Sequence, residues 1–269
     1  MKIITSIFDL NKEIKNYKNI GFVPTMGGIH AGHISLIKAS QNKKSKTIVS
    51  IFVNPTQFNK GDDFKQYPRN IQKDIDILEK LNVEYLFTPN TKDIYKFRAK
   101  KFNLKKKDKI LCAKYRIGHF EGVLNVMNRL MTMIKSKDLY MGEKDYQQLY
   151  LIKKFLSKKF KVRINSCPTI RINNIALSTR NKLLKKKSIK KASEIALFLK
   201  KVKYKSKFEG TKLASDLHNY KIKLEKKYNI KVDYLEFRDE KNLKLNNFNN
   251  KYRLFVAYEI DNIRLIDNY

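Results

Sequence analysis

The stretch that decides the fold is residues 20–33, which read Ile20-Gly21-Phe22-Val23-Pro24-Thr25-Met26-Gly27-Gly28-Ile29-His30-Ala31-Gly32-His33. Residues 20–23 form an apolar run that predicts a buried strand. Pro24 is expected to end the strand, because proline has no backbone N–H for a central ladder. The two glycines then permit a tight turn, and a helix is expected to open at the histidines.

His30 and His33 are three residues apart, so both imidazoles are expected on one face of the first helical turn. The unpaired N–H groups and the dipole of a helix N-terminus favour an anion. Two histidines added there predict a phosphate site. The alternative is a chance pair on a helix surface. It is disfavoured because the chain has only 4 histidines and two of them follow this strand and turn.

Strands and helices alternate in the first part of the chain. Apolar runs predict further strands over residues 47–53, 83–87 and 139–141 and around residues 162–164, while residues 90–115 show no clear pattern. Helical spacing predicts helices over 6–18, from the histidines to about 41, around 71–78, over 123–134 and to about 155. This order predicts an α/β fold, a Rossmann-like doubly wound parallel sheet with ligands at the carboxyl ends of its strands.

The character of the chain changes after about residue 172. Residues 188–201 and 212–228 are expected to be helices, 232–237 a strand, and 252–266 a hairpin around Asp261-Asn262. We therefore expect two domains: residues 1–172, which are Rossmann-like, and residues 173–269, a smaller C-terminal α+β domain that acts as a lid.

Composition excludes several classes of protein. The chain has 269 residues, 42% of them hydrophobic, and no apolar run long enough to cross a bilayer. Its two cysteines, Cys112 and Cys167, have no metal-ligand spacing and are expected to be reduced thiols in a cytoplasmic protein. The formal net charge of +34 invites a nucleic-acid hypothesis. The lysines are scattered, however, so we expect no specific nucleic-acid partner and only non-specific attraction of anions.

The stretch from Pro24 to His33 resembles the signature of the pantoate–β-alanine ligase (pantothenate synthetase) family, in the His-x-Gly-His nucleotidyltransferase superfamily. Three further motifs agree with the family in order and spacing: Asn54-Pro55-Thr56-Gln57-Phe58, Gly142-Glu143-Lys144-Asp145-Tyr146-Gln147-Gln148, and Leu177-Ser178-Thr179-Arg180-Asn181. The resemblance covers nearly the whole chain.

The resemblance implies a role for each motif. His33 is the implied proton donor, with His30 beside it as a second catalytic group. Gln57 and Gln148 are implied to bind pantoate, and Gln57 also lies near β-alanine. ATP contacts are implied at Met26, Gly27, Gly28, Ile29, His30, Ala31, Gly32, His33, Gly142, Glu143, Lys144, Asp145, Ile170, Leu177, Ser178, Thr179 and Arg180.

Each motif also has a plain structural interpretation. Gln57 taken alone is an ordinary polar loop residue, Glu-Lys-Asp is common on surfaces, and Ser178 or Thr179 is suited to cap a helix. Thr179 replaces the serine of the family but keeps the hydroxyl. The loop before it is shorter than usual, and we place the backbone contact to adenine at Ile170.

One segment departs from the family pattern. Arg116-Ile117-Gly118-His119-Phe120-Glu121-Gly122-Val123 has Ile117 in place of proline and Glu121 in place of arginine. Cys112-Ala113 stands where the family usually has Glu-Gly. His119 keeps its place, but we do not expect it to be catalytic, and the sequence assigns no role to the segment.

The implied reaction is the AMP-forming condensation of ATP, (R)-pantoate and β-alanine to pantothenate, AMP and diphosphate, through a pantoyl adenylate, in pantothenate and coenzyme A biosynthesis. Mg²⁺ is implied by ATP chemistry, with no protein metal site visible. Asp62 and Asp63 could approach the metal, although a solvated turn is the favoured interpretation. A homodimer is implied by resemblance alone.

Three alternatives remain open. Another nucleotidyltransferase of the superfamily should lack the pair Gln57 and Gln148. A basic nucleic-acid-binding protein on an old fold should have a contiguous basic face with interleaved aromatics. A decayed enzyme is compatible with Ile117, Glu121 and Cys112-Ala113, but the phosphate motifs are intact.

Overall fold

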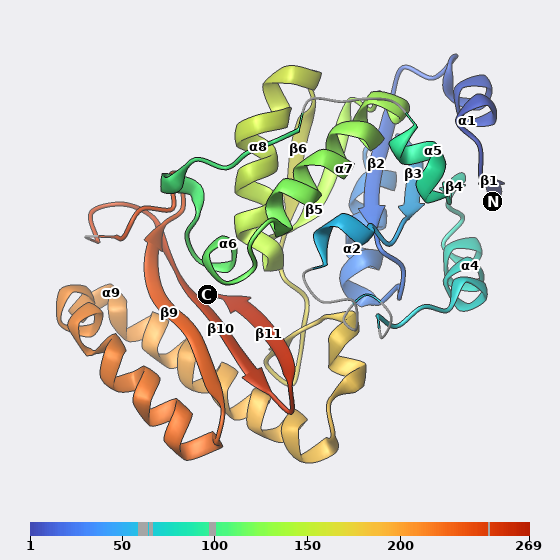
Figure 1. Cartoon of the computed structure of the whole chain (residues 1–269). Helices are drawn as coiled ribbons and strands as arrows, with labels where there is room; N and C mark the ends of the chain where they lie inside the picture. Colours follow the sequence, from blue (N-terminus) through green and yellow to red (C-terminus); the bar gives the residue numbers. More distant parts are fainter. Residues whose placement is uncertain (59–63, 65–66, 97–100, 247) are drawn as a thin grey trace. The chain divides into compact units, whose positions relative to one another are not determined.

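The computed structural model describes all residues except 59–63, 65–66, 97–100 and 247 (Figure 1). Asp62 and Asp63 therefore lie outside the described residues. The chain forms two compact units, Met1–Thr169 and Ile170–Tyr269. The division falls slightly before residue 172, where the change in sequence character placed it, because the hairpin that starts the second unit begins directly after the last strand of the first.

The first unit is built on a six-stranded sheet in the order β1-β4-β3-β2-β5-β6, and every neighbouring pair is parallel. The chain fills the sheet outward from β2 to β3 and β4, then returns to the other side of β2 for β5 and β6. This order confirms the predicted Rossmann-like doubly wound sheet and puts the switch point between β2 and β5. The strands are β1 (Lys2–Ile4), β2 (Ile20–Thr25), β3 (Lys46–Ile51), β4 (Tyr85–Phe87), β5 (Asp138–Gly142) and β6 (Arg163–Cys167).

Pro24 does not end β2, which continues to Thr25. The Thr25 carbonyl accepts the N–H of Phe52, so Thr25 faces the β3 side and, by alternation, Pro24 faces the β5 side. The ladder with β5 covers only Gly21 and Phe22. Pro24 is therefore tolerated because its missing N–H faces a side of the strand where pairing has already stopped.

The edge strand β1 was not expected from the sequence, because a three-residue run is too short to show a period. In the described part of the unpatterned residues 90–115, which excludes 97–100, the structure has two short helices and a 3₁₀ turn. The helical elements of this unit are α1 (Ile7–Ile14), α2 (Ala31–Gln41), η1 (Pro55–Gln57), α4 (Ile71–Lys80), α5 (Thr91–Tyr95), η2 (Lys106–Asp108), α6 (Cys112–Tyr115), α7 (His119–Ile134), η3 (Glu143–Asp145) and α8 (Tyr146–Phe160).

Apolar side chains of α2 and α4 share one cluster with alternate residues of the strands. Leu36, Ile37 and Leu78 pack with Val23 and Val49, and all five are buried. α7 instead packs with α1 and α8. Because right-handed crossovers on the two sides of β2 place their helices on opposite faces, the sheet is covered on both faces and its strands are buried.

The second unit confirms the predicted α+β character. Its three-stranded antiparallel sheet has the order β11-β10-β9, formed by β9 (Lys231–Asp239), β10 (Tyr252–Ile260) and β11 (Ile263–Asn268). The unit begins with a small hairpin of two strands, β7 (Arg171–Ile172) and β8 (Ile175–Ala176). A 3₁₀ turn, η4 (Thr179–Leu183), follows and leads into the long helix described next.

The two helices expected over 188–201 and 212–228 are joined into α9 (Lys186–Tyr228). A break does exist, because Glu209 has the non-helical angles φ −127° and ψ 36°. Buried residues on both arms, including Leu199 and Leu217, belong to one core cluster with Val256 of β10. The kink thus lets both arms of the helix use the same hydrophobic core.

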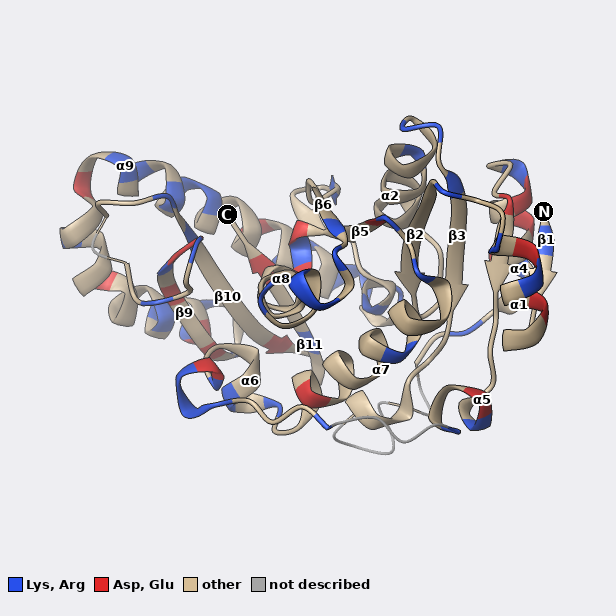
Figure 2. Ribbon diagram, turned by 90° about the horizontal axis from the view of Figure 1, so that it is seen from above, with Lys and Arg blue, Asp and Glu red and all other residues tan. Residues whose placement is uncertain are grey.

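Charge is dispersed rather than gathered. Figure 2 shows Lys and Arg on helices and loops of both units, with Asp and Glu between them. Arg163 and Lys43 near Asp138, and Arg264 near Asp233, are examples of such pairing. Across the described parts of the chain, we find no helix with the length and apolarity needed to span a membrane.

Candidate active site

Three of the four motifs follow neighbouring strands of the parallel sheet. The turn at Gly27-Gly28 follows β2, the loop at Asn54 follows β3, and Gly142 ends β5. Because the carboxyl ends of parallel strands meet at one edge, these three segments share the edge of the sheet around the switch point. This is where doubly wound sheets bind their ligands.

The turn after β2 depends on its glycines and on a buried carboxylate. Gly27 and Gly28 have φ of 81° and 64°, in the left-handed region that glycine adopts without strain. Asp74 of α4 is 3% exposed, and its two oxygens accept the N–H groups of Gly28 at 2.8 Å and Ile29 at 2.7 Å. These two N–H groups are thus engaged by the protein itself, so the turn is held by α4 before any ligand arrives.

His30 and His33 open α2 as the sequence predicted. His30 is the N-cap residue, and its Nδ1 accepts the N–H of Gly32 at 3.1 Å. An accepting Nδ1 leaves the proton of a neutral imidazole on Nε2. The two rings are stacked, with centroids 4.1 Å apart and planes at 23°. Both side chains are half-buried, so this pair combines a fixed orientation with access to a ligand.

The loop after β3 holds Gln57 in a buried position. Gln57 is 9% exposed, its Nε2 donates to Sδ of Met26 at 2.7 Å, and its Oε1 accepts from Nδ2 of Asn54 at 3.3 Å. The Met26 contact joins this loop to the turn after β2. The amide of Gln57 is therefore oriented both by the turn after β2 and by its own loop.

The side chain of Asn54 makes several of the hydrogen bonds that hold that loop. Its Oδ1 accepts from the hydroxyl of Tyr95 at 2.7 Å and from the N–H and hydroxyl of Thr56, while its Nδ2 donates to the carbonyl of Gly122. Burial raises the pKa of the Tyr95 phenol, although the hydrogen bond with Thr56 opposes the shift. Tyr95 consequently stays protonated and keeps donating to Asn54 at neutral pH.

The segment after β5 supplies a cation and two glutamines. Lys144 lies 3.4 Å from Asp145, and its side chain is 18% exposed. Gln147 is buried and donates to the carbonyl of Ile110, whereas Gln148 is half-buried at the first turn of α8. The two glutamines therefore differ in access, and Gln148 is the one that the sequence selected for substrate.

The fourth motif lies in the second unit. Ser178 caps η4 by accepting the N–H of Arg180 at 3.3 Å, and Asn181 completes a capping box. Thr179 is 4% exposed, while Arg180 is half-buried. The carbonyl of Ile170 accepts the N–H of Leu177 at 3.0 Å across the β7–β8 hairpin. The capping interpretation of Ser178 is thus correct, and Arg180 carries the charge of this motif.

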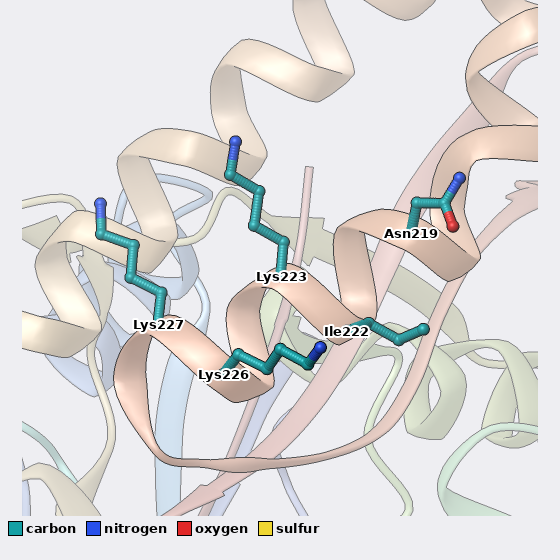
Figure 3. Close-up of a pocket in the computed structure, with 5 residues that line it drawn as sticks. All are labelled: Asn219, Ile222, Lys223, Lys226 and Lys227. Carbon is teal, nitrogen blue, oxygen red and sulfur yellow. The ribbon is translucent and has the colours of Figure 1, made fainter.

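A pocket of about 520 Å³ lies on the second arm of α9, lined by Asn219, Ile222, Lys223, Lys226 and Lys227 (Figure 3). It contains no residue of the four motifs. The described residues also contain no group of three or more His, Cys, Asp or Glu side chains arranged to hold a metal ion. Neither feature adds a ligand to the candidate site.

Comparison with known proteins decides the family. The family model described as pantoate–β-alanine ligase matches residues 2–269. The chain belongs to the pantoate–β-alanine ligase family. It is 38% identical to the pantothenate synthetase of Flavobacterium psychrophilum, over 97% of this chain and 98% of that protein. It is 39% identical to that of Francisella tularensis subsp. novicida, over 99% of this chain and 95% of that protein.

Solved structures of this ligase family share the fold. The crystal structure of pantoate–β-alanine ligase from Francisella tularensis, complexed with β-γ ATP and β-alanine, matches with a TM-score of 0.85 and 39% identity, covering 100% of this chain and 97% of that one. The pantothenate synthetase of Thermus thermophilus matches with a TM-score of 0.90 and 29% identity, covering 100% of this chain and 99% of that one. These comparisons confirm the predicted family, its ligase class and its Rossmann-like fold.

Sequence reasoning missed several residues that support the site of the ligase. Asp74, Asn54 and Tyr95 orient the turn and the loop. Asn54 was quoted as part of its motif but given no role, and Asp74 and Tyr95 were not named. Asp74 did carry a signal: it lies three residues after Ile71 and four before Leu78, so an acidic residue sits on the apolar stripe of a helix. Tyr95 carried none, because its helix lies in the unpatterned stretch.

Proposed function

We propose that this chain catalyses the condensation of (R)-pantoate with β-alanine at the expense of ATP, giving pantothenate, AMP and diphosphate. Membership of the family supports this, as does the similarity to the Francisella ligase complexed with β-γ ATP and β-alanine. The observation that carries the proposal is local. The stacked pair His30 and His33 opens the helix after β2, and the oriented amide of Gln57 contacts Met26 of the same turn.

The chemistry has two steps. An oxygen of the pantoate carboxylate attacks the α-phosphorus of ATP, the bond from that phosphorus to the bridging oxygen breaks, and diphosphate leaves. The pantoyl adenylate then has AMP as its leaving group in place of oxide. The β-alanine amine attacks the acyl carbon, the bond to AMP breaks, and the amine loses a proton as the amide forms.

We assign the first step to the turn after β2. Because Nδ1 of His30 accepts the Gly32 N–H, its Nε2–H is the proposed hydrogen-bond donor to the phosphates. His33, whose ring stacks on that of His30, is the proposed proton donor to the reacting phosphates. Positioning of this kind and stabilisation of developing charge are the main means by which proteins accelerate phosphate transfers. The backbone of residues 26–29 frames the nucleotide, while Asp74 holds that backbone rigid.

The remaining contacts follow from the other motifs. Lys144 and Arg180 supply positive charge for the phosphates, with Gly142, Glu143 and Asp145 beside Lys144 and with Leu177, Ser178 and Thr179 before Arg180. Ile170 is the proposed backbone contact to adenine. Gln57 and Gln148 are proposed to hold pantoate, because an amide both donates to and accepts from its hydroxyl and carboxylate oxygens.

Mg²⁺ is proposed to arrive with ATP, bound mainly by phosphate oxygens and water, as is usual for this ion. The described residues assign it no protein ligand, and no step is drawn through it. A homodimer, a cytoplasmic location and the lack of a specific nucleic-acid partner are likewise proposals.

The experiment is a product assay with purified protein, ATP, Mg²⁺ and pantoate, with and without β-alanine, at moderate salt to suppress binding of polyanions. We expect pantothenate and AMP in equal amounts only when β-alanine is present. We also expect pantoate-dependent exchange of labelled diphosphate into ATP without β-alanine. Exchange without pantothenate would mean that adenylation occurs but that the amine substrate is different or its site is damaged. The lack of any ATP consumption would refute the proposal.

A further inference from the structure

His119, the first residue of α7, and Arg116, which lies just before that helix, contact the main chain of Gln57. Nδ1 of His119 lies 2.7 Å from the Gln57 carbonyl oxygen, and Nη2 of Arg116 lies 3.4 Å from the same oxygen. Nη1 of Arg116 lies 3.0 Å from Nε2 of His119. His119 is 7% exposed and follows Gly118, whose φ of 80° lets the chain enter the helix at this angle. The Gln57 carbonyl is thus contacted by two side chains, those of His119 and Arg116, which also contact each other.

These contacts fix the protonation of His119. A carbonyl oxygen only accepts, so Nδ1 must carry a proton. A guanidinium only donates, so Nε2 must present its lone pair to Arg116. Both conditions are met by the neutral imidazole with its proton on Nδ1. Both ring nitrogens are occupied by protein groups, which leaves His119 unsuited to direct proton transfer and suited to holding a neighbour.

The same residue, Gln57, is held at its other end. Its side-chain amide donates to Sδ of Met26 and accepts from Asn54, and Asn54 in turn donates to the carbonyl of Gly122 on α7. A Cβ added to Gly122 would lie 2.4 Å from the carbonyl oxygen of Thr56, so η1 and α7 approach closely. Movement of the η1 main chain would therefore move the Gln57 amide directly.

We propose that His119, together with Arg116, is a positioning residue that presets Gln57 for pantoate; this rests on the proposed function. It gives the Arg-x-Gly-His segment a role through Gln57 rather than through direct contact with substrate. It also explains which departures from the family pattern the segment tolerates. Ile117 is 80% exposed, and Glu121 instead accepts the N–H of Leu104 at 3.4 Å, so the contacts to Gln57 described above use neither residue.

The kinetic test compares His119→Asn with His119→Leu. The amide nitrogen of Asn takes nearly the place of Nδ1 and keeps the donor, while Leu leaves the buried carbonyl without it. Because the buried Gln57 carbonyl loses its donor and η1 can shift, we expect KM for pantoate to rise roughly tenfold or more in the Leu variant. KM for ATP should change less than about twofold, and the Asn variant should recover most of the loss.

His218→Asn is the matched control, because His218 is an exposed histidine on α9 in the other unit. Equal rises in KM for pantoate and ATP in the Leu variant, or no recovery in the Asn variant, would overturn the proposal. Circular dichroism and urea unfolding identify a variant that does not fold, and in that case the tautomer of His119 in the wild-type protein decides.

A second readout does not depend on activity. Nitrogen-15 NMR of the imidazoles distinguishes a neutral ring protonated on Nδ1 from one protonated on Nε2, and the signal lost in His119→Asn assigns His119. We expect a protonated Nδ1 and an unprotonated Nε2. The opposite tautomer would contradict the positioning role even if the enzyme is active. If the wild-type protein makes no pantothenate but shows the expected tautomer, the proposed function fails and the contact to Gln57 stands.

Discussion

The carboxylate of Asp74 on α4 holds the backbone of Gly28 after β2, with Oδ2 accepting the Gly28 N–H at 2.8 Å. Its other oxygen accepts the N–H of Ile29. A glycine turn at a helix start is usually taken as a ready-made phosphate cradle. Here an internal anion already engages two of its donors, so Asp74 shapes the turn.

Replacing Asp74 with Asn tests this arrangement. The Asn side chain offers one oxygen and sets an NH₂ group against the second backbone N–H. A hydrogen bond to a charged group contributes about 1.5–3 kcal/mol, so we expect Asp74→Asn to lower the free energy of unfolding by roughly 2–4 kcal/mol and to raise KM for ATP. Urea unfolding and steady-state kinetics measure both effects.

The control for Asp74 is Asp76→Asn, because Asp76 is an exposed carboxylate on the same helix. It should change the free energy of unfolding by no more than about 0.5 kcal/mol. If Asp74→Asn behaved like this control, the turn would not depend on α4.

His33→Ala tests the proposed proton donor. Loss of one strong transition-state contact costs about 3 kcal/mol, so we expect pantoate-dependent exchange of diphosphate into ATP to slow roughly a hundredfold. His218→Ala, at an exposed histidine, should leave the exchange rate unchanged. An unchanged rate in His33→Ala would remove His33 from the adenylation step.

His30 has two roles that substitutions separate. Its Nδ1 caps α2 by accepting the N–H of Gly32. His30→Ala should therefore lose about 1 kcal/mol of stability as well as adenylation rate, whereas His30→Asn keeps a good N-cap and should lose rate alone. Thermal unfolding compared with diphosphate exchange distinguishes them. Equal stability of the two variants would show that the cap contributes nothing.

Much of this molecule follows from local sequence rules, and the exceptions have identifiable causes. The apolar run at residues 20–23, the helix opened by His30 and the alternation that gives the parallel sheet all follow from the period of burial and from turn residues. The predicted end of the strand at Pro24 was wrong, because pairing on the side of its missing N–H has already stopped and β2 continues to Thr25. β1 was missed because an edge strand of three residues has no period. Two separate helices were predicted where the structure has one helix with a kink at Glu209, because the spacing of apolar residues is clear only within each arm.

The candidate site was predictable only in part, because motifs name residues but not what holds them. His30, Gln57 and Lys144 were predicted as site residues from the sequence. The hydrogen bond from His119 to Gln57, however, depends on two segments far apart in the chain coming together. No local period encodes such a contact. Asp74 was the exception, since an acidic residue on an apolar helix face already signals a buried partner.

Gly122→Ala tests the close approach of α7 to η1. The new Cβ would meet the carbonyl oxygen of Thr56 at 2.4 Å and the backbone nitrogen of Gln57 at 3.0 Å, and neither backbone atom moves easily. Overpacking costs about 1–3 kcal/mol, which exceeds the roughly 1 kcal/mol that alanine contributes to helix propensity. We expect lower stability and a higher KM for pantoate.

Thr132→Ala is the control for Gly122→Ala, because Thr132 is exposed on the same helix. It should leave KM for pantoate unchanged. A Gly122→Ala variant that is more stable than wild type and keeps its KM would mean that η1 shifts without consequence for Gln57.

Asp138 at the start of β5 is expected to make the free energy of unfolding fall at acid pH. Asp138 is 4% exposed, and Arg163 donates to both its oxygens, from Nε at 2.6 Å and from Nη2 at 2.7 Å. Asn165 donates as well, at 2.7 Å. The hydrogen bond with Arg163 holds the pKa of the Asp138 carboxyl below its usual range, against the opposing effect of burial.

The sign of the pH effect follows from that lowered pKa. The folded state keeps the carboxylate ionised at pH values where the unfolded chain, with a pKa of about 3.9, is already protonated. The stabilisation is thus fully present above about pH 4 and is lost as the pH falls through the lower folded value. In urea unfolding, Asp138→Asn should be less stable than wild type at pH 7, and the difference should shrink as the pH falls below about 4. A difference that stays constant as the pH falls would show that the ion pair with Arg163 does not set the stability of this corner of the sheet.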